Sequence, residues 1–295
     1  MVWLIGNKGM LGSEVEPLLG ESGRECVVSD KEVDITDYNQ LRDFAGKKTI
    51  SWIVNCSAYT AVDRAEDEPE AARAVNSRGI QNIARLASEQ KARLIHISTD
   101  YVFDGTKDGA YTEEDTPNPR GAYGSSKLEG ERNVQGSIKE YFILRTAWLY
   151  GKNGPNFVNT VLRLFGERDE VRVVDDQWGS PTYAKDLAGA VVRIIENGAD
   201  SYGIYHFTNE GRTNWYEFAK EIHYLARERG IIQKEVNIVP IPTEQYPTRA
   251  ARPKNSLLSK EKIKRELGVE CREWKAALEE YLTKDWPQMN ADARG

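Results

Sequence analysis

Tyr123 and Lys127 lie four residues apart in the segment Arg120-Gly-Ala-Tyr-Gly-Ser-Ser-Lys-Leu-Glu-Gly-Glu131. In a helix this spacing places both side chains on one face, one turn apart. An ammonium beside a phenol stabilises the phenolate, so we expect the pKa of Tyr123 to fall from about 10 towards neutrality. A tyrosine tuned in this way can exchange a proton with a substrate oxygen. Tyr-x-x-x-Lys is common by chance. The pair is therefore evidence of catalysis only if the chain also contains a cofactor site and a substrate site.

A glycine-rich turn at the start of the chain is a candidate cofactor site. The apolar run Val2–Ile5 leads into Gly6-Asn-Lys-Gly9-Met-Leu-Gly12, and a helical pattern follows. Strand, glycine turn and helix in this order are typical of a dinucleotide site, where a pyrophosphate approaches backbone N–H groups at the helix N-terminus. The spacing is Gly-x-x-Gly-x-x-Gly rather than Gly-x-Gly-x-x-Gly, and an ordinary glycine-rich turn is the alternative.

An acidic residue ends the second expected strand, Cys26–Asp30, about 20 residues beyond the glycine turn. Asp30 could accept a hydrogen bond from the ribose 2′-OH of NADH, whereas Lys31 could hold the 2′-phosphate of NADPH. These residues leave the choice between the two cofactors open. Asp34 and Ile35 follow in a loop that could cover the adenine.

Three further apolar runs, 52–56, 93–97 and 141–145, predict buried strands. Five alternations of strand and helix in about 150 residues indicate an α/β fold, a Rossmann-type doubly wound parallel sheet with right-handed crossovers. Such a sheet binds ligands at the carboxyl ends of its strands. The segment from Pro69 to about Lys91 is expected to form one helix, with Asn76 exposed or locally bonded.

The remainder predicts a smaller C-terminal α+β substrate domain. Residues 1–150 are expected to form an NAD(P)-binding domain, to which about 184–209 return. Residues 151–183 and 210–286 would form the nucleotide-sugar domain, and 287–295 a frayed tail. A Pro-rich stretch covers 239–253, between helices expected at 215–229 and 259–267.

Composition and charge narrow the function classes. The chain has 40 basic and 46 acidic residues, a net charge of -6, and no basic block, which argues against nucleic-acid binding. No apolar run approaches the roughly 20 residues that span a bilayer, and the N-terminus does not resemble a signal peptide. We therefore expect a cytoplasmic protein with no membrane partner.

The cysteines and histidines predict no metal site. Three widely spaced cysteines are expected to be reduced thiols: Cys26, Cys56 and Cys271. Three histidines lack the spacing of metal ligands: His96, His206 and His223. The first two lie in apolar runs and are expected to be hydrogen-bonded core residues.

The glycine turn, Thr99 and the Tyr123/Lys127 pair occur in the order that one site requires. With them the chain resembles the extended short-chain dehydrogenase/reductase family, most closely its dTDP-4-dehydrorhamnose reductases. The resemblance extends from Val2 to about Trp286. Its most specific stretches are Ala58-Tyr-Thr-Ala-Val-Asp-Arg-Ala-Glu66, Ser98-Thr-Asp-Tyr-Val-Phe-Asp-Gly105, Asp176-Gln-Trp-Gly-Ser-Pro-Thr182 and Arg252-Pro-Lys-Asn-Ser256.

The resemblance implies a role for each matching position. Thr99, Tyr123 and Lys127 would be the catalytic residues. The cofactor, NADPH or NADH, would be contacted by Gly6, Gly9, Met10, Leu11, Gly12, Asp30, Asp34, Ile35, Ala58, Tyr59, Thr60, Tyr123 and Lys127. A nucleotide-sugar substrate would be contacted by Thr99, Asp100, Tyr123, Trp148 and Arg252. Thr99 is chosen over Ser98 by motif alignment, since the residues alone allow either hydroxyl.

The implied reaction is reduction of the C4 keto group of dTDP-4-dehydro-L-rhamnose to dTDP-L-rhamnose by hydride from NAD(P)H, with Tyr123 as proton donor. A nucleotide-sugar epimerase of the same family is one alternative. A dehydratase is disfavoured because Thr99 is followed by Asp100-Tyr101 rather than by Asp-Glu. A non-catalytic NADP-binding subunit, resembling the regulatory subunit of methionine adenosyltransferase, is an alternative of another class. Some members form dimers, so a homodimer is possible.

Overall fold

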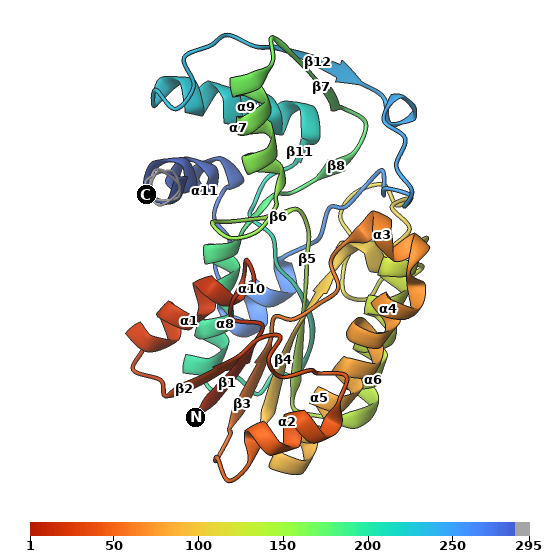
Figure 1. The fold of residues 1–295 in the computed structure, drawn as a ribbon, viewed down its shortest axis with the longest axis vertical. Helices are drawn as coiled ribbons and strands as arrows, with labels where there is room; N and C mark the ends of the chain where they lie inside the picture. The colour runs from red at the N-terminus through yellow and green to blue at the C-terminus, as the bar shows by residue number, and fades with distance from the viewer. Residues whose placement is uncertain (287–295) are drawn as a thin grey trace.

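Figure 1 shows a computed structural model of the chain, in which residues 1–286 are described. The lower lobe contains a six-stranded sheet in the order β10-β5-β4-β3-β1-β2, and each neighbouring pair is parallel. Its strands are β1 (Val2–Ile5), β2 (Cys26–Ser29), β3 (Trp52–Asn55), β4 (Arg93–Thr99), β5 (Tyr141–Thr146) and β10 (Gly203–His206). The predicted doubly wound α/β sheet is therefore confirmed.

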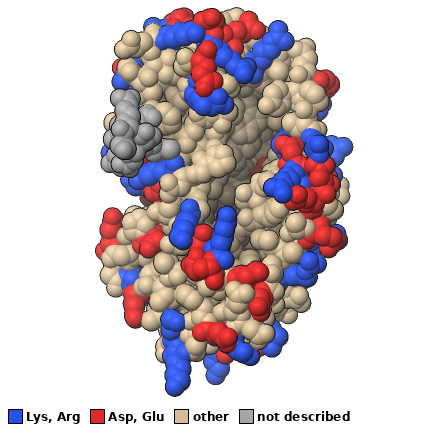
Figure 2. All heavy atoms as spheres, viewed as in Figure 1, with Lys and Arg blue, Asp and Glu red and all other residues tan. Residues whose placement is uncertain are grey.

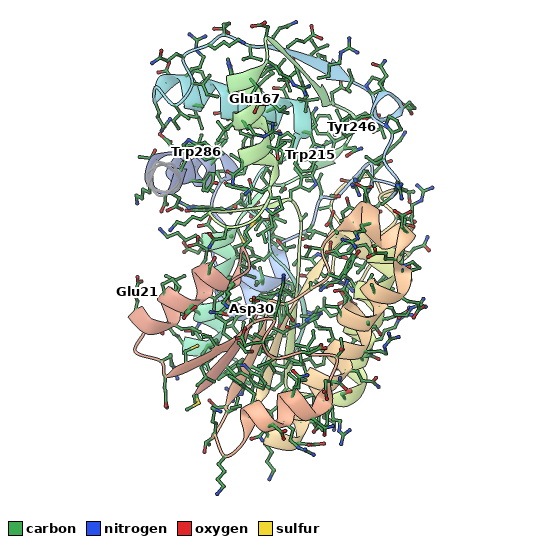
Figure 3. The ribbon with its side chains drawn as sticks, viewed as in Figure 1. Glu21, Asp30, Glu167, Trp215, Tyr246 and Trp286 are labelled. Atoms are coloured by element: carbon green, nitrogen blue, oxygen red, sulfur yellow. The ribbon has the colours of Figure 1, made fainter. Side chains whose placement is uncertain are left out.

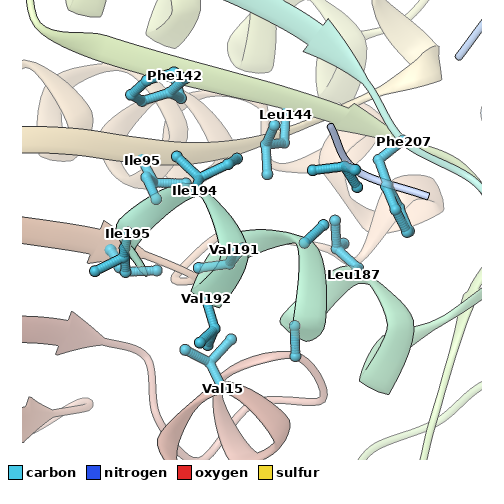
Figure 4. Packing of buried hydrophobic residues seen from close by; sticks show 14 of the residues in the cluster. Val15, Ile95, Phe142, Leu144, Leu187, Val191, Val192, Ile194, Ile195 and Phe207 are labelled. Carbon is cyan, nitrogen blue, oxygen red and sulfur yellow. The ribbon is translucent and has the colours of Figure 1, made fainter. Parts of the chain in front are cut away.

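Helices cover both faces of this sheet because its strands are apolar on both sides. In β1, Val2 and Leu4 belong to one hydrophobic cluster and Trp3 and Ile5 to the other. Figure 4 shows the first cluster, in which helix α8 packs between helix α1 and the strands. That face is covered by α1 (Gly12–Glu21), α8 (Ala184–Glu196) and α10 (Glu261–Leu267), and the other by α2 (Tyr38–Ala45), α5 (Ile80–Gln90) and α6 (Ala122–Ser137).

The long helix expected after Pro69 is built from three consecutive segments. These are α4 (Pro69–Arg73), the π-helical segment η1 (Ala74–Gly79) and α5. Asn76 lies in the π-helical segment, and its side chain is fully buried. It bonds to residues 17 and 50 positions away, so the prediction of an exposed or locally bonded Asn76 is wrong.

The upper lobe has its own apolar core around α7 (Phe157–Glu167), α9 (Trp215–Glu228) and α11 (Trp274–Glu280). Strand β12 (Asn237–Ile241), which pairs with β7 (Glu170–Val174), overlaps the start of the Pro-rich stretch and was not predicted. Pro240 is tolerated there because β12 is an edge strand. The remaining short elements are α3 (Val62–Asp67), β6 (Leu149–Tyr150), β8 (Trp178–Gly179), β9 (Thr182–Tyr183), β11 (Thr213–Asn214), η2 (Asp100–Val102), η3 (Thr243–Gln245) and η4 (Tyr281–Asp285).

Two further observations concern the whole described chain. Across residues 1–286, no helix combines the length and apolar character needed to cross a membrane. The tail expected at 287–295 lies outside the described residues.

Candidate active site

The surface between the two lobes is hollowed, as Figure 2 shows. The strands of the lower lobe run towards this hollow (Figure 1). Figure 3 labels Asp30 in the lower lobe, near the hollow, and Trp215 in the upper lobe above it. Strand β1 lies between β2 and β3, so the strand order reverses at β1. The carboxyl ends of β1 and β3 therefore flank the place where a doubly wound sheet binds a dinucleotide.

The glycine turn after β1 leaves no room for side chains at two positions. Gly6 has φ +81°, and a Cβ built on it would lie 2.8 Å from the Ser57 amide nitrogen. A Cβ on Gly12 would lie 2.1 Å from the Gly6 carbonyl oxygen. The Gly9 N–H donates to the same oxygen at 3.2 Å, which closes the turn. Helix α1 begins at Gly12, so its N-terminus lies at the turn, and this arrangement fits a pyrophosphate.

The side chains of Met10 and Leu11, in the same turn, pack against different parts of the structure. The Leu11 side chain is buried in the core. The Met10 side chain lies so close to Gly151 that a Cβ built there would be 3.1 Å from Met10 Cγ. The turn is thus packed against the segment that follows β6.

Asp30 follows the end of β2, beside the glycine turn. The Gly6 N–H donates to the Ser29 carbonyl oxygen at 2.7 Å, and Glu32 Oε1 accepts from the Asp30 N–H at 2.8 Å. Asp34 accepts from the backbone and side chain of Thr36, both at 2.8 Å. The next residue, Ile35, is buried, and its side chain packs against Gly79. Ile35 was predicted to contact the adenosine, but its side chain packs in the core.

Asn76 couples the loop after β3 to helix α6, which carries Tyr123. Its Oδ1 accepts from the Tyr59 N–H at 2.8 Å, and its Nδ2 donates to the Tyr59 carbonyl oxygen at 3.0 Å and to Ser126 Oγ at 3.1 Å. Ala58 and Thr60 flank the residue that is held. Our sequence reasoning ranked Asn76 low, and the neighbouring Ser77 and Arg78 are also polar, so no local signal distinguished it.

Helix α6 begins where a carboxylate from α3 binds its first amide. Glu66 Oε1 accepts from the Ala122 N–H at 2.8 Å, a favourable position for a negative charge at a helix N-terminus. A Cβ at Gly121 would lie 2.5 Å from that oxygen, so the approach depends on glycine. This contact fixes the start of the helix, one residue before Tyr123.

The structure brings Thr99 and Tyr123 together at the end of β4. The Thr99 hydroxyl lies close enough to the phenol to lower its pKa, and it donates to Asp100 Oδ1 at 3.0 Å. The hydroxyl of Ser98 instead donates to Glu131, on the far side of the strand end. Of the two hydroxyls that the sequence left open, the Thr99 hydroxyl is therefore the one beside the phenol.

The pKa of Tyr123 shifts in the direction opposite to the one predicted. Burial of the phenol raises its pKa to about 12. Lys127 Nζ donates to the Ile97 carbonyl oxygen at 2.6 Å, and the desolvation of this ammonium lowers its pKa to about 8. The predicted fall of the Tyr123 pKa is wrong because desolvation outweighs the lowering effect of Thr99, and the charge of Asp100 raises the pKa further. A phenol of raised pKa stays protonated at neutral pH, as a proton donor must.

Asp100 is buried between β4 and the segment that follows Arg252. Its Oδ1 accepts from the Thr99 hydroxyl at 3.0 Å, and Ser256 lies close enough to lower the pKa of the carboxyl group. The Ser256 N–H donates to the Trp178 carbonyl oxygen at 2.7 Å. Burial is the largest influence on this carboxyl group and raises its pKa to about 6.

Asp100 is expected to make stability fall as the pH rises. Its pKa is about 6 in the folded protein against 3.8 for the unfolded reference, so its stabilising contribution is complete below about pH 4 and is lost through pH 6. The loss is on the order of 3 kcal/mol. Urea unfolding of the wild type and of Asp100→Asn at several pH values measures it. The difference in unfolding free energy between the two proteins should change by this amount; parallel pH curves would contradict the assignment.

Trp148 forms an aromatic wall on the upper-lobe side. It has a left-handed φ of +50°, which is uncommon for a residue with a side chain. Its ring stacks on Trp215 with centroids 3.6 Å apart and planes 15° apart. A Cβ on Gly179 would lie 2.7 Å from Trp148 Cε2, so the ring is held between these two residues. Trp215 was missed because its contact with Trp148 spans 67 positions.

Arg252 lies beside an acidic residue of α3 that the sequence reasoning also missed. Its Nη2 donates to Asp63 Oδ2 at 2.6 Å, and Asp63 Oδ1 accepts from the Ala250 N–H at 3.0 Å. The Arg252 guanidinium lies 5.9 Å from the Tyr101 ring centroid, and that ring meets Tyr123 edge-on at 5.5 Å. The predicted anion-binding arginine therefore lies on the same side as the phenol.

The histidines and cysteines lie in positions that suggest structural rather than catalytic roles. His96 Nδ1 lies 3.0 Å from Asn55 Nδ2, and His206 Nδ1 lies 3.2 Å from the Tyr111 carbonyl oxygen, as expected of core histidines. The three cysteines carry no disulfide. Within residues 1–286, no group of three or more His, Cys, Asp or Glu side chains is arranged to hold a metal ion.

Comparison with known proteins places this site in a family. A family profile described as "RmlD substrate binding domain" matches residues 1–286. The dTDP-4-dehydrorhamnose reductase of Aggregatibacter actinomycetemcomitans is 41% identical over 281 residues, covering 93% of this chain and 96% of that protein. The dTDP-4-keto-6-deoxy-D-glucose reductase of Streptomyces niveus is 36% identical, covering 98% of each.

A solved structure extends the similarity to the fold. The dTDP-4-dehydrorhamnose reductase of Bacillus anthracis, in complex with NADP, is 38% identical and superposes with a TM-score of 0.89, covering 95% of this chain and 97% of that one. The match in sequence and fold thus covers nearly all of both lobes. The chain belongs to the dTDP-4-dehydrorhamnose reductase family of NAD(P)-dependent sugar-nucleotide reductases.

Proposed function

We propose that the chain reduces the C4 keto group of dTDP-4-dehydro-L-rhamnose to dTDP-L-rhamnose with NADPH or NADH. The observation that carries the proposal is the buried, protonated phenol of Tyr123 in contact with Thr99 at the carboxyl end of β4. The glycine turn lies at the carboxyl end of β1, along the same edge of the sheet. Family membership supports the reaction class, and the reductase of A. actinomycetemcomitans supports this sugar.

Each residue has a definite task in this reaction. When bound, NAD(P)H supplies the hydride for the carbonyl carbon. Tyr123 gives its proton to the oxygen that becomes an alkoxide, and Thr99 hydrogen-bonds that oxygen. Lys127 would hold the nicotinamide ribose. The segment Gly6–Gly12 would hold the pyrophosphate through backbone N–H groups.

The substrate is held by groups around the same hollow. Asp100 and Trp148 would contact the sugar, Trp148 through the part of its ring that Trp215 and Gly179 leave uncovered. The Arg252 guanidinium would bind the diphosphate, since its planar fork can bond two phosphate oxygens. It would then exchange its partner Asp63 for phosphate oxygens.

A coupled assay tests the proposal. The keto sugar is made in situ from dTDP-glucose, and oxidation of NADPH and NADH is followed side by side. One reduced cofactor should be consumed per sugar reduced. Sugar interconversion without net consumption would replace the proposal with an epimerase. No reaction, together with co-purification of a methionine adenosyltransferase, would replace it with a regulatory subunit.

The identity of the sugar needs a second comparison, because the S. niveus relative carries the name of a different keto-sugar reductase. We expect kcat/KM to be higher for dTDP-4-dehydro-L-rhamnose than for dTDP-4-keto-6-deoxy-D-glucose. The reverse order would keep the reductase and change its substrate.

A further inference from the structure

A buried ion pair lies behind the candidate catalytic residues. Glu131 is on α6, four residues after Lys127, and Arg145 is on β5. Arg145 donates from Nε and Nη2 to the two Glu131 carboxylate oxygens at 2.9 and 2.6 Å, and the side chains are 2% and 1% exposed. The Ser98 hydroxyl of β4 donates to the same carboxylate. Glu131 therefore joins the helix that carries Tyr123 to the two strands beneath it.

Apart from Glu131 and its partner Arg145, the titratable groups around Lys127 are neutral near pH 7. Burial lowers the pKa of His96 on β4 well below its usual value, and it raises the pKa of Cys56, just after β3, to about 12. Tyr123, on the same helix, keeps its proton for the same reason. Of the described groups that interact with Lys127, Glu131 is thus the one with a negative charge.

The charge of Glu131 opposes the effect of burial on Lys127. Desolvation of the ammonium lowers its pKa to about 8, and the nearby carboxylate limits that fall. Residues four apart on a helix are neighbours, and their charges interact strongly where water is excluded.

We propose that Glu131 is a positioning residue of this site, whose charge, held in place by Arg145 and Ser98, keeps the Lys127 ammonium protonated. Lys127 then remains a hydrogen-bond donor at neutral pH. The consequence for catalysis rests on the proposed function; the relation between the two charges does not.

Titration of Lys127 in the cofactor-free protein tests the charge relation directly. The protein is labelled with ¹³C at the lysine ε-carbons, and Lys127→Met identifies the resonance by its loss. In Glu131→Gln the pH midpoint of Lys127 should fall by about 1 unit, because a neutral amide no longer favours the ammonium.

Two further variants make the result decisive. Glu131→Gln leaves Arg145 buried without its partner, which can unfold a protein. Glu131→Gln/Arg145→Met removes both charges, so its midpoint should still fall below the wild-type value, but by less than in Glu131→Gln because losing the Arg145 charge favours the ammonium. Ser98→Ala is the matched control, because it deletes a neutral hydrogen bond to the same carboxylate and should leave the midpoint unchanged. An unchanged midpoint in a folded Glu131 variant, or an equal shift in Ser98→Ala, overturns the proposal.

Kinetics separate this inference from the proposed function. The alkaline limb of kcat/KM for keto-sugar reduction should move to lower pH in Glu131→Gln by about 1 unit, matching the NMR midpoint. An inactive wild type with a shifted midpoint would refute the proposed function and leave the role of Glu131 intact. An active wild type whose Glu131 variants keep the original Lys127 midpoint would support the proposed function and refute the role of Glu131.

Discussion

Replacing Tyr123 with phenylalanine is expected to lower turnover of the keto sugar by roughly 100- to 10,000-fold, the usual contribution of a general acid. The phenol contacts Thr99 and is protonated at neutral pH because burial raises its pKa to about 12. Phenylalanine keeps the ring that packs edge-on against Tyr101, so the fold should persist. The affinity for NADPH, measured by fluorescence titration, should be nearly unchanged.

A matched control separates loss of the phenol from a general effect of Tyr-to-Phe changes. Tyr224 is 59% exposed on α9, so Tyr224→Phe should leave turnover and NADPH affinity at their wild-type values. A Tyr123→Phe enzyme that retained most of its rate would remove Tyr123 from the mechanism, whatever the control showed.

Replacing Gly12 with alanine is expected to weaken NADPH binding by more than about 100-fold, or about 2.7 kcal/mol. The new Cβ would lie 2.1 Å from the Gly6 carbonyl oxygen and 2.7 Å from Asn7 Cα, both backbone atoms. The turn must therefore move, and its N–H groups would leave the pyrophosphate position. Isothermal titration with NADPH measures the loss.

The same helix provides the control for this substitution. No atom lies within 4 Å of a Cβ built on Gly20, near the end of α1. Gly20→Ala should therefore preserve NADPH affinity and raise stability by up to about 1 kcal/mol. Wild-type affinity in a folded Gly12→Ala protein would show that the turn does not hold the cofactor.

Local patterns were sufficient for the architecture of the lower lobe. Each strand of its sheet, such as Val2–Ile5, is a short apolar run followed by a polar or glycine-rich turn. These runs are buried on both faces, so they can be recognised without knowledge of their neighbours. β12 escaped prediction because its pairing with β7 is set by residues about 67 positions away and it contains a proline.

Some residues of the candidate site could likewise be predicted from local sequence, and others could not. The spacing of Tyr123 and Lys127 fixes their common helix face, and the glycines at 6 and 12 mark a close backbone approach. The position of Asn76 in the site was not predictable, because its partners are 17 and 50 residues distant. Asp63 and Trp215 were missed because each is placed in the site by contact with a distant residue. Asp63 pairs with Arg252, and Trp215 stacks on Trp148.

The sequence by itself determined the residue types, their order along the chain and the helical or strand period that places them on a face. Only the tertiary structure decided that the hydroxyl of Thr99 meets the phenol, and that the hydroxyl of Ser98 turns to Glu131. It also reversed the expected pKa shift of Tyr123. Adjacent charges can be seen in a sequence, but the loss of solvent around a buried group depends on packing between distant segments.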